Sequence, residues 1–165
     1  MTALRGDPEL AGVVADSGAF LCLMHMQGRP RTMQADPRYD DVVSEVAAFL
    51  EERLRFAVDA GIAEDRICLD PGIGFGKTVE HNLALLRGLP RLARIGRPLL
   101  VGVSRKSFLM RLTRPGRAGD RLAASLAATV EAYRGGATLL RVHDVAETVD
   151  ALAIVRSIEG ERART

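Results

Sequence analysis

The sequence predicts a parallel α/β fold in a single unit that spans residues 1–165. Four short apolar runs each precede a segment with helical spacing, and this alternation is typical of βαβ units. The runs are apolar throughout, which indicates strands that are covered on both faces. A doubly wound sheet and a closed barrel both fit these observations. In either fold, the residues that follow the carboxyl ends of the strands gather at one edge of the sheet.

The chain opens with a short helix and a strand. Asp7 and Pro8 suit the start of a helix over residues 9–15, and Gly18 suits its end. The apolar run Ala19–Met26 predicts a buried strand that delivers its carboxyl end into a long polar loop. The first strand end therefore carries methionine, histidine and glutamine side chains.

The second unit contains the clearest amphipathic helix. Apolar residues recur at helical spacing from Asp40 until Gly61 closes the segment. The strand Arg66–Asp70 follows and runs into a glycine-rich loop. A further helix is predicted from Val79 to Gly88, with Pro90 breaking it or starting another turn.

Two more strands complete the pattern. Leu99–Val103 is a predicted strand followed by helical pieces that include residues 122–134 and stop at a glycine pair. Thr138–Val142 is the fourth predicted strand. Asp144 and Glu147 have the spacing of a capping box, which predicts the last helix, to about residue 158.

Composition narrows the class of protein. Lys and Arg total 23 against 21 Asp and Glu and are scattered along the chain, so no nucleic-acid footprint is indicated. No apolar stretch approaches the ~18 residues that span a bilayer. Cys22 and Cys68 lie inside apolar runs without CxxC spacing, so we expect two buried, reduced thiols in a cytoplasmic protein.

Two common site motifs are absent. The glycine-rich loop 72–78 is no P-loop, because Pro71 stands where the first glycine belongs, and Lys77 replaces the third glycine of GxGxxG. No local ligand spacing predicts a metal in the protein itself. A zinc site would have to draw its ligands from distant positions, namely Cys22, His25, Cys68 and His143.

The predicted strand ends place one acid and several bases together. A purely structural role is an alternative for two of them: Asp70 could form a turn, and His25 could pack in the core. The run Ser104–Ser107, with Arg141 and His143 on one face of the next strand, suits an anionic ligand. The residues alone therefore indicate a phosphorylated, partly aromatic substrate.

Four blocks at these strand ends are similar, in order, to dihydropteroate synthases. They are Leu23–Gly28, Leu69–Lys77, Val101–Ser107 and Arg141–Val145. The resemblance implies a parallel (β/α)8 barrel of the TIM type. Such barrels need ~250 residues, so we expect only the C-terminal part, about strands 5–8, to be present. It also implies condensation of 6-hydroxymethyl-7,8-dihydropterin pyrophosphate with p-aminobenzoate to give 7,8-dihydropteroate and pyrophosphate.

The resemblance also assigns roles to matching positions. Asp70 and Lys106 correspond to the catalytic pair, with Asp70 on the pterin ring and Lys106 between the two substrates. The other implied substrate-binding residues are Met24, Gly102, Phe75, Ser107, Arg141 and His143. Mg²⁺ is implied as the cofactor, held mainly by the pyrophosphate and by an asparagine in the missing half. A homodimer is implied for the full-length form.

Two other functions stay open at this stage. A pterin-binding methyltransferase domain would have the same type of barrel, although the Ser104–Ser107 block argues against this function. A non-catalytic pterin-binding module would suit a chain that lacks the family's early blocks. For the isolated chain we expect no condensation activity.

Overall fold

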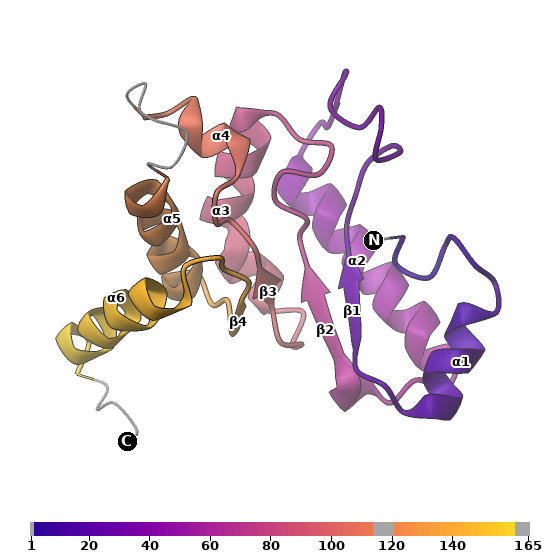
Figure 1. Ribbon diagram of the computed structural model, residues 1–165. Coiled ribbons are helices and arrows are strands. Elements are labelled where there is room, and N and C mark those ends of the chain that lie inside the picture. Colours follow the sequence, from indigo (N-terminus) through magenta and orange to yellow (C-terminus); the bar gives the residue numbers. More distant parts are fainter. Residues whose placement is uncertain (1, 114–120, 161–165) are drawn as a thin grey trace.

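The computed structural model describes residues 2–113 and 121–160, which form an α/β structure (Figure 1). Its elements, in chain order, are α1 (Leu10–Ser17), β1 (Leu21–Met24), α2 (Val42–Asp59), the 3₁₀ turn η1 (Glu64–Arg66), β2 (Ile67–Asp70), α3 (Val79–Ala93), β3 (Leu100–Val101), α4 (Ser107–Met110), α5 (Leu122–Arg134), β4 (Leu139–Leu140) and α6 (Val145–Ile158). The predicted alternation of strands and helices is confirmed. Each strand is shorter than its apolar run.

All strand pairings in the described residues are parallel. β1 pairs with β2 over Leu21–Met24, and β3 pairs with β4. A bridge between Leu69 and Leu99 links the two pairs, so the order is β1-β2-β3-β4, the same as in the sequence. In the part of the chain that the structure describes, the outer edges of β1 and β4 have no partner strand.

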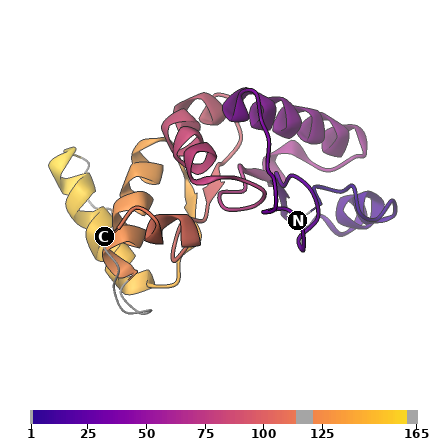
Figure 2. The same ribbon diagram turned by 90° about the horizontal axis from the view of Figure 1, so that it is seen from above.

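The long helices lie along the outer side of the strands and form an arc (Figure 2). The core fills the space between them, and its largest fully buried side chains include Leu23, Leu50, Leu69, Leu85, Leu89, Leu92, Leu99 and Val101. Leu23, Leu69 and Val101 alternate with residues that point to the opposite face. The sheet therefore has one helix-covered face and one inner face, the face turned away from the helices.

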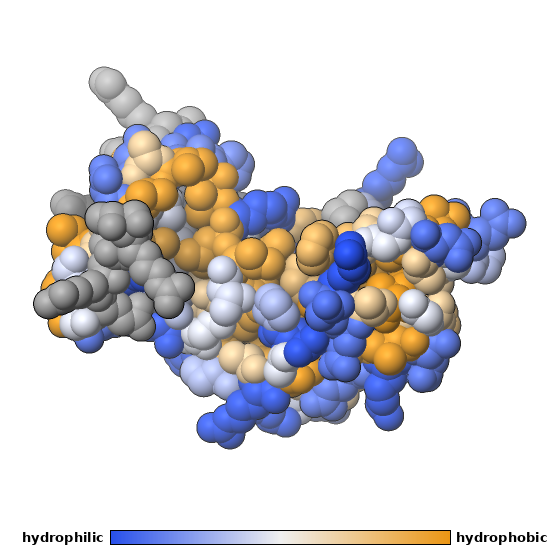
Figure 3. All heavy atoms as spheres, turned by 90° about the horizontal axis from the view of Figure 1, so that it is seen from below, coloured by the Kyte–Doolittle hydropathy of each residue, from blue (hydrophilic) through white to orange (hydrophobic). Residues whose placement is uncertain are grey.

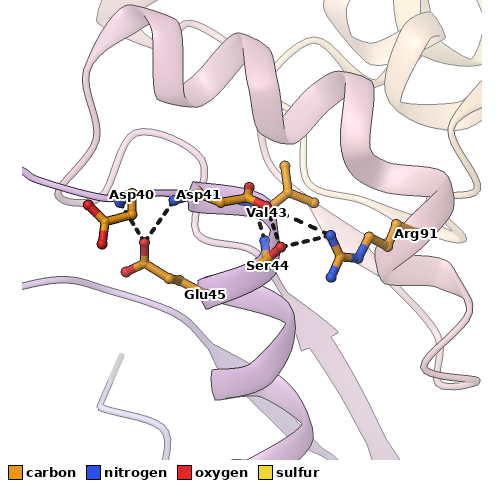
Figure 4. A network of polar contacts seen from close by, with 6 residues as sticks. All are labelled: Asp40, Asp41, Val43, Ser44, Glu45 and Arg91. Carbon is orange, nitrogen blue, oxygen red and sulfur yellow. Dashed lines mark hydrogen bonds and ion pairs between the residues drawn. The ribbon is translucent and has the colours of Figure 1, made fainter.

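Helix α2 begins at a network of polar contacts (Figure 4). The Asp41 carboxylate accepts hydrogen bonds from the backbone amides of Val43 and Ser44, and Glu45 accepts from the amides of Asp40 and Asp41. These bonds satisfy amides that have no partner inside the helix. Arg91 of α3 donates to Ser44 Oγ at 2.8 Å, which ties the two helices together.

Helix α3 continues through Pro90, so the predicted end at Gly88 is wrong. It ends at Ala93. Proline removes one bond of the helix ladder, but Leu89 and Leu92 on either side of it are completely buried. Their packing offsets the lost bond and keeps the last turn helical.

The predicted capping box at Asp144 is also wrong. Asp144 is the residue before α6, but its side chain makes no capping hydrogen bond. The carboxylate instead binds the Arg105 guanidinium, with Nη2–Oδ1 at 2.5 Å and Nε–Oδ2 at 3.2 Å. A two-pronged ion pair is a stronger bond than one to a backbone amide.

The expectation of buried cysteines fails as well. Cys22 is exposed and Cys68 is half-buried, because both lie on the inner face that no helix covers. Large apolar side chains are open at both ends of the arc, with Phe20 81% exposed beside β1 and Ile158 74% exposed on α6. Figure 3, which views the amino ends of the strands, shows apolar surface between charged groups. In the described part of the chain, no helix is long and apolar enough to span a membrane.

Candidate functional site

The carboxyl ends of the four strands bring the predicted polar residues to one edge of the sheet, the upper edge in Figure 1. Met24 is in register with Asp70 on adjacent strands. One residue beyond the paired ends of β3 and β4, Gly102 lies beside Arg141. Alternation along the strands puts these four residues on the inner face. We call this edge, with the loops that follow it, the strand-end site.

Asp70 is a buried acid at the centre of this site. It is 5% exposed, and its Oδ1 accepts a hydrogen bond from the Gly72 amide at 2.7 Å. Burial raises the pKa of Asp70, and the Gly72 bond and nearby cations oppose that rise. An acid of this kind has one oxygen left to accept from a ligand, at a place where water is mostly excluded.

The loop after Asp70 is held in one conformation by long-range bonds. The Gly74 amide donates to Asn82 Oδ1 at 2.7 Å, and Gln34 donates to the Gly74 carbonyl at 2.7 Å. Gly72 has a φ of +67°, and a Cβ there would lie 1.8 Å from the His25 carbonyl oxygen. Glycine is required at this position, since only glycine allows the loop to cross His25 so closely. The loop thereby fixes Phe75.

Lys106 lies over the Phe75 ring. Its Nζ is 4.1 Å from the ring centroid, which is cation–π geometry. Lys106 is the N-cap residue of α4, so the turn after β3 sets where its side chain begins. Burial lowers the pKa of Lys106, Arg141 lowers it further, and Asp70 opposes both. An ammonium and an aromatic wall thus stand beside the buried acid.

Arg141 and His143 approach from the fourth strand. A Cβ on Gly102 would lie 3.2 Å from the Arg141 guanidinium, so the glycine leaves room for that side chain. His143 Nδ1 is 3.0 Å from Ser104 Oγ, and the His143 amide donates to the same oxygen at 3.2 Å. Arg141, His143, Lys106 and Phe75 line a hollow of about 530 Å³. Cationic and imidazole donors that converge on one hollow suit an anionic group.

Ser107 is the one predicted site residue that lies apart. It lines a second hollow of about 350 Å³, bounded by residues 34–37 and the start of α3, on the far side of Gly74. The remaining predicted site residues are brought together along the strand ends. Met24 is 7% exposed and forms the floor next to Asp70.

Sequence reasoning missed several contributors. Arg121 lies at the first hollow and donates to the Arg105 carbonyl at 3.0 Å, although it starts a helix far along the chain. Lys77 is buried, with Nζ 3.0 Å from both the Phe75 carbonyl and His25 Nδ1. Lys77 lies in the glycine-rich loop, but once the P-loop motif was rejected no further signal in the sequence indicated a role for this lysine.

No protein metal centre is evident among residues 2–113 and 121–160, where no three His, Cys, Asp or Glu side chains are grouped to hold an ion. The acid of the strand-end site is surrounded by cations. Mg²⁺ prefers several oxygen ligands, and the described residues do not offer such a set.

Comparison with known protein families identifies the family of this chain. Residues 1–143 match the family described as "Pterin binding enzyme". The chain belongs to this pterin-binding family. A dihydropteroate synthase from Neisseria meningitidis serogroup B is 51% identical over 153 residues, covering 91% of this chain and 53% of that protein. The chain thus spans about half the length of the curated relatives it matches.

Solved members of the pterin-binding family superpose closely. Dihydropteroate synthase from Stenotrophomonas maltophilia, with imidazole bound in its active site, gives a TM-score of 0.92 at 46% identity over 98% of this chain and 61% of that chain. The Xanthomonas albilineans enzyme in complex with 7,8-dihydropteroate gives 0.87 at 46% identity, covering 96% of this chain and 57% of that one.

Proposed function

We propose that this chain supplies the carboxyl-terminal half, strands 5–8, of the (β/α)8 barrel of a dihydropteroate synthase. Among residues 2–113 and 121–160, four parallel strands lie in sequence order, helices lie along one side of them, and the outer edges of β1 and β4 have no partner strand. This arrangement favours a segment of a barrel over a doubly wound sheet. The reaction is the condensation of 6-hydroxymethyl-7,8-dihydropterin pyrophosphate with p-aminobenzoate. One observation carries the proposal: a buried acid lies beside an aromatic-stacked lysine and an Arg–His pair at a single sheet edge.

The pterin is held on the inner face. Asp70 accepts hydrogen bonds from the donor-rich ring through its free oxygen, and Met24 and Gly102 line the flat pocket on either side. Because Asp70 is buried, bonds to it are stronger than bonds to an exposed acid. The solved Xanthomonas albilineans relative in complex with 7,8-dihydropteroate supports a site for this ring system.

The second substrate lies on the other side of Lys106. Phe75 provides the aromatic wall against p-aminobenzoate, and Ser107, in the neighbouring hollow, is placed near its carboxylate. Lys106 lies between the two substrates. The Xanthomonas albilineans dihydropteroate synthase has also been solved with 4-aminobenzoic acid, which supports a site for this ligand.

The chemistry is a substitution at the pterin methylene carbon. The carbon–oxygen bond breaks, and pyrophosphate leaves with the electron pair toward Arg141 and His143. The arylamine nitrogen then attacks the cation-like carbon and loses a proton. The fixed donors stabilise the charge that develops on the leaving group. No covalent bond to the protein forms.

Three further properties belong to the proposal. Mg²⁺ would be held by the substrate pyrophosphate and by an asparagine outside this chain, where it would offset the negative charge of the leaving group. The full-length protein is a homodimer in the cytoplasm. The dimer can be tested by analytical ultracentrifugation of the full-length protein, and magnesium by its removal with a chelator during pyrophosphate binding.

A complementation assay tests the function directly. The purified 165-residue chain is incubated with both substrates and Mg²⁺, alone and mixed with the separately made amino-terminal half of a relative. We expect dihydropteroate only in the mixture, because the chain alone lacks the other side of the pocket. Asp70→Asn in the mixture serves as the inactive control. A mixture that associates but makes no product would favour the non-catalytic pterin-binding module.

A further inference from the structure

Arg105 has an uncommon backbone conformation directly before Lys106. Its φ is +57°, in the left-handed region that residues other than glycine rarely adopt. Such a conformation persists only where surrounding contacts hold it. Two contacts from the start of α5 do so at the backbone: the Arg105 amide donates to Ser125 Oγ at 2.9 Å, and the Arg105 carbonyl accepts from Arg121 at 3.0 Å. The turn after β3 is therefore held on the side of α5.

The Arg105 side chain holds the same turn from the side of α6. Its guanidinium binds both oxygens of Asp144, the residue before α6, and the Asp144 side chain is only 18% exposed. One residue earlier on each side, Ser104 Oγ lies 3.0 Å from the His143 ring and accepts from the His143 amide at 3.2 Å. Two consecutive residues after β3 are thus bonded to two consecutive residues after β4. These contacts join the turn after β3 to the turn after β4.

Lys106 follows this turn directly. Its amide donates to the Val103 carbonyl at 3.2 Å, and its Nζ lies 4.1 Å from the centroid of the Phe75 ring. Lysine has a flexible four-carbon side chain, so the position of its ammonium depends on where the backbone places its Cα. A change of Arg105 to the right-handed region would move the Lys106 backbone and take the ammonium off the Phe75 ring.

We propose that Arg105 and Asp144 are positioning residues, whose ion pair holds the turn after β3 and thereby keeps the Lys106 ammonium over Phe75. The role of Lys106 in the reaction belongs to the proposed function, on which this inference rests, but its placement over Phe75 can be measured without it. None of the roles assigned above uses either residue of the pair. The Arg105 side chain is 50% exposed, and exposed ion pairs add little to stability. The pair should therefore matter more for turnover than for folding.

NMR of the 165-residue chain with labelled lysine tests the placement. The sequence has two lysines, Lys106 is assigned by its alanine variant, and protons that lie over an aromatic ring are shifted upfield. We expect Arg105→Ala and Asp144→Ala each to move the Lys106 side-chain shift most of the way to its value in Phe75→Leu, which lacks the ring. Arg105→Gly should move it less, because glycine adopts a positive φ without strain. Unchanged shifts in both alanine variants would overturn the proposal.

A second ion pair of α6 provides the matched control. Arg134 binds Glu159 at 3.1 Å, which joins the other end of α6 to α5, and the Arg134 side chain is 48% exposed. Arg134→Ala therefore removes the same charge and a similar contact away from the strand ends. The Lys106 signal should stay in place. A shift as large as that in Arg105→Ala would mean that Lys106 responds to any loosening of α6, and it would overturn the specific role of Arg105.

Kinetics in the completed barrel test the consequence for the reaction. We expect Asp144→Ala to lower kcat by about 10–10²-fold, the effect of a small misplacement of a catalytic group, with KM for both substrates nearly unchanged. In a Lys106→Ala background the same substitution should lower kcat little further, since the pair acts through Lys106. A pair with a merely structural role would lower kcat by the same factor in both backgrounds, and that result would overturn the proposal.

The Asp144 variant also separates positioning from direct binding. Arg105 borders the hollow of about 530 Å³ that Arg141 and His143 line, so it could contact the leaving group itself. In that case Asp144→Ala would leave kcat unchanged while Arg105→Ala raised KM for the pterin pyrophosphate, which would overturn the positioning role. A completed barrel without turnover in any form, the unmodified chain included, would reject the proposed function, and the Lys106 shifts would still decide whether the ion pair places the lysine.

Discussion

Lys77 donates from a buried ammonium to Nδ1 of His25 at 3.0 Å, and to the Phe75 carbonyl at the same distance. Burial lowers the pKa of His25 to about 3, with Lys77 adding to the effect. Burial also lowers the pKa of Lys77 to about 7, and Asp70 opposes that shift. The imidazole is therefore neutral at pH 7, and its Nδ1 can accept a hydrogen bond from Lys77 while that lysine is protonated. A lysine that binds the loop of Phe75 is close to losing its charge there.

This pair makes folding stability depend on pH. An unfolded Lys77 binds its proton up to about pH 10.5, whereas the folded one releases it near pH 7. Between these values the unfolded state binds more protons, so stability rises with pH. At about 1.4 kcal/mol per pKa unit, the whole rise is roughly 5 kcal/mol as an upper bound. We predict that Lys77→Met removes it, measured by urea unfolding at several values from pH 6.5 to 10.

Direct titration provides the control. Lys77 and Lys106 are the only lysines in the sequence, so labelled lysine gives two NMR signals, and the variant assigns them. Urea unfolding reports every group that gains or loses a proton in this range, so the difference between the two proteins is the informative quantity. A Lys77 signal that titrates above pH 10 would contradict this account.

Glycine at position 72 should be essential for folding. Gly72 and Gly96 both have positive φ, at +67° and +88°, but a Cβ at Gly72 would lie 1.8 Å from the His25 carbonyl, while at Gly96 nothing lies within 4 Å. We predict that Gly96→Ala costs about 1–2 kcal/mol for its backbone alone. Gly72→Ala should cost at least about 1–3 kcal/mol more, since backbone must move. Urea unfolding of both variants measures the difference, and equal losses would show that the loop can shift freely.

Much of this fold was predictable, for identifiable reasons. The helix from Val42 to Asp59 has strong apolar periodicity and an acidic cap, and both signals are local. The capping box at Asp144 failed because a residue 39 positions away, Arg105, takes the carboxylate. The predicted burial of Cys22 was wrong because an apolar run does not reveal which face of a strand is covered.

The positions of some residues around the strand-end site were predictable from the sequence, and the positions of others were not. The placement of Asp70 and Arg141 at one edge of the sheet was predictable, because parallel strands bring their carboxyl ends together. Ser107 was grouped with them from its sequence position, but helix α4 turns it into the next hollow. Arg121 was missed because a helix start distant in sequence gives no local signal.

Asp70→Asn should cut turnover strongly in the completed barrel and leave folding intact. Asparagine keeps an oxygen that accepts the hydrogen bond from the Gly72 amide. It also removes the free-energy cost of burying a carboxylate, the same cost that raises the pKa of Asp70. The lost charge is needed in the transition state, a class of change worth roughly 2.7–4 kcal/mol. Turnover should fall by about 10²–10³, with the melting temperature unchanged or higher. Near wild-type kcat/KM would remove Asp70 from the pterin site.

Lys106→Ala should have a similar effect on turnover for a different reason. It removes the ammonium that lies 4.1 Å over the Phe75 ring, between the two proposed substrates. We expect kcat to fall by about 10²–10³, which corresponds to a loss of roughly 2.7–4 kcal/mol of transition-state stabilisation. The melting temperature should change little, since the ammonium is only half-buried. Lys106→Arg keeps a cation over the ring and should recover part of kcat. Full activity in Lys106→Ala would reject the assignment.

Arg141→Ala should weaken binding of the pyrophosphate group without weakening binding of the pterin ring. The guanidinium lies against Gly102 and shares a hollow with His143, so its donors lie where the leaving pyrophosphate is proposed to sit. In the completed barrel, we predict that the variant weakens the pterin pyrophosphate by about 1.5–3 kcal/mol, the range for bonds to charged groups. The same pterin without phosphates should bind almost as before.

Calorimetry with both ligands measures this difference, and a charge-matched variant separates local contact from net charge. Arg134→Ala removes one positive charge at the end of α5, where Arg134 pairs with Glu131 and Glu159. Its effect on either ligand should be small and should vanish as salt screens long-range attraction. The Arg141→Ala loss should persist in high salt, since a two-pronged contact is short and directional. Equal losses for the two pterins would move Arg141 out of the anion site and leave His143 as its main protein donor.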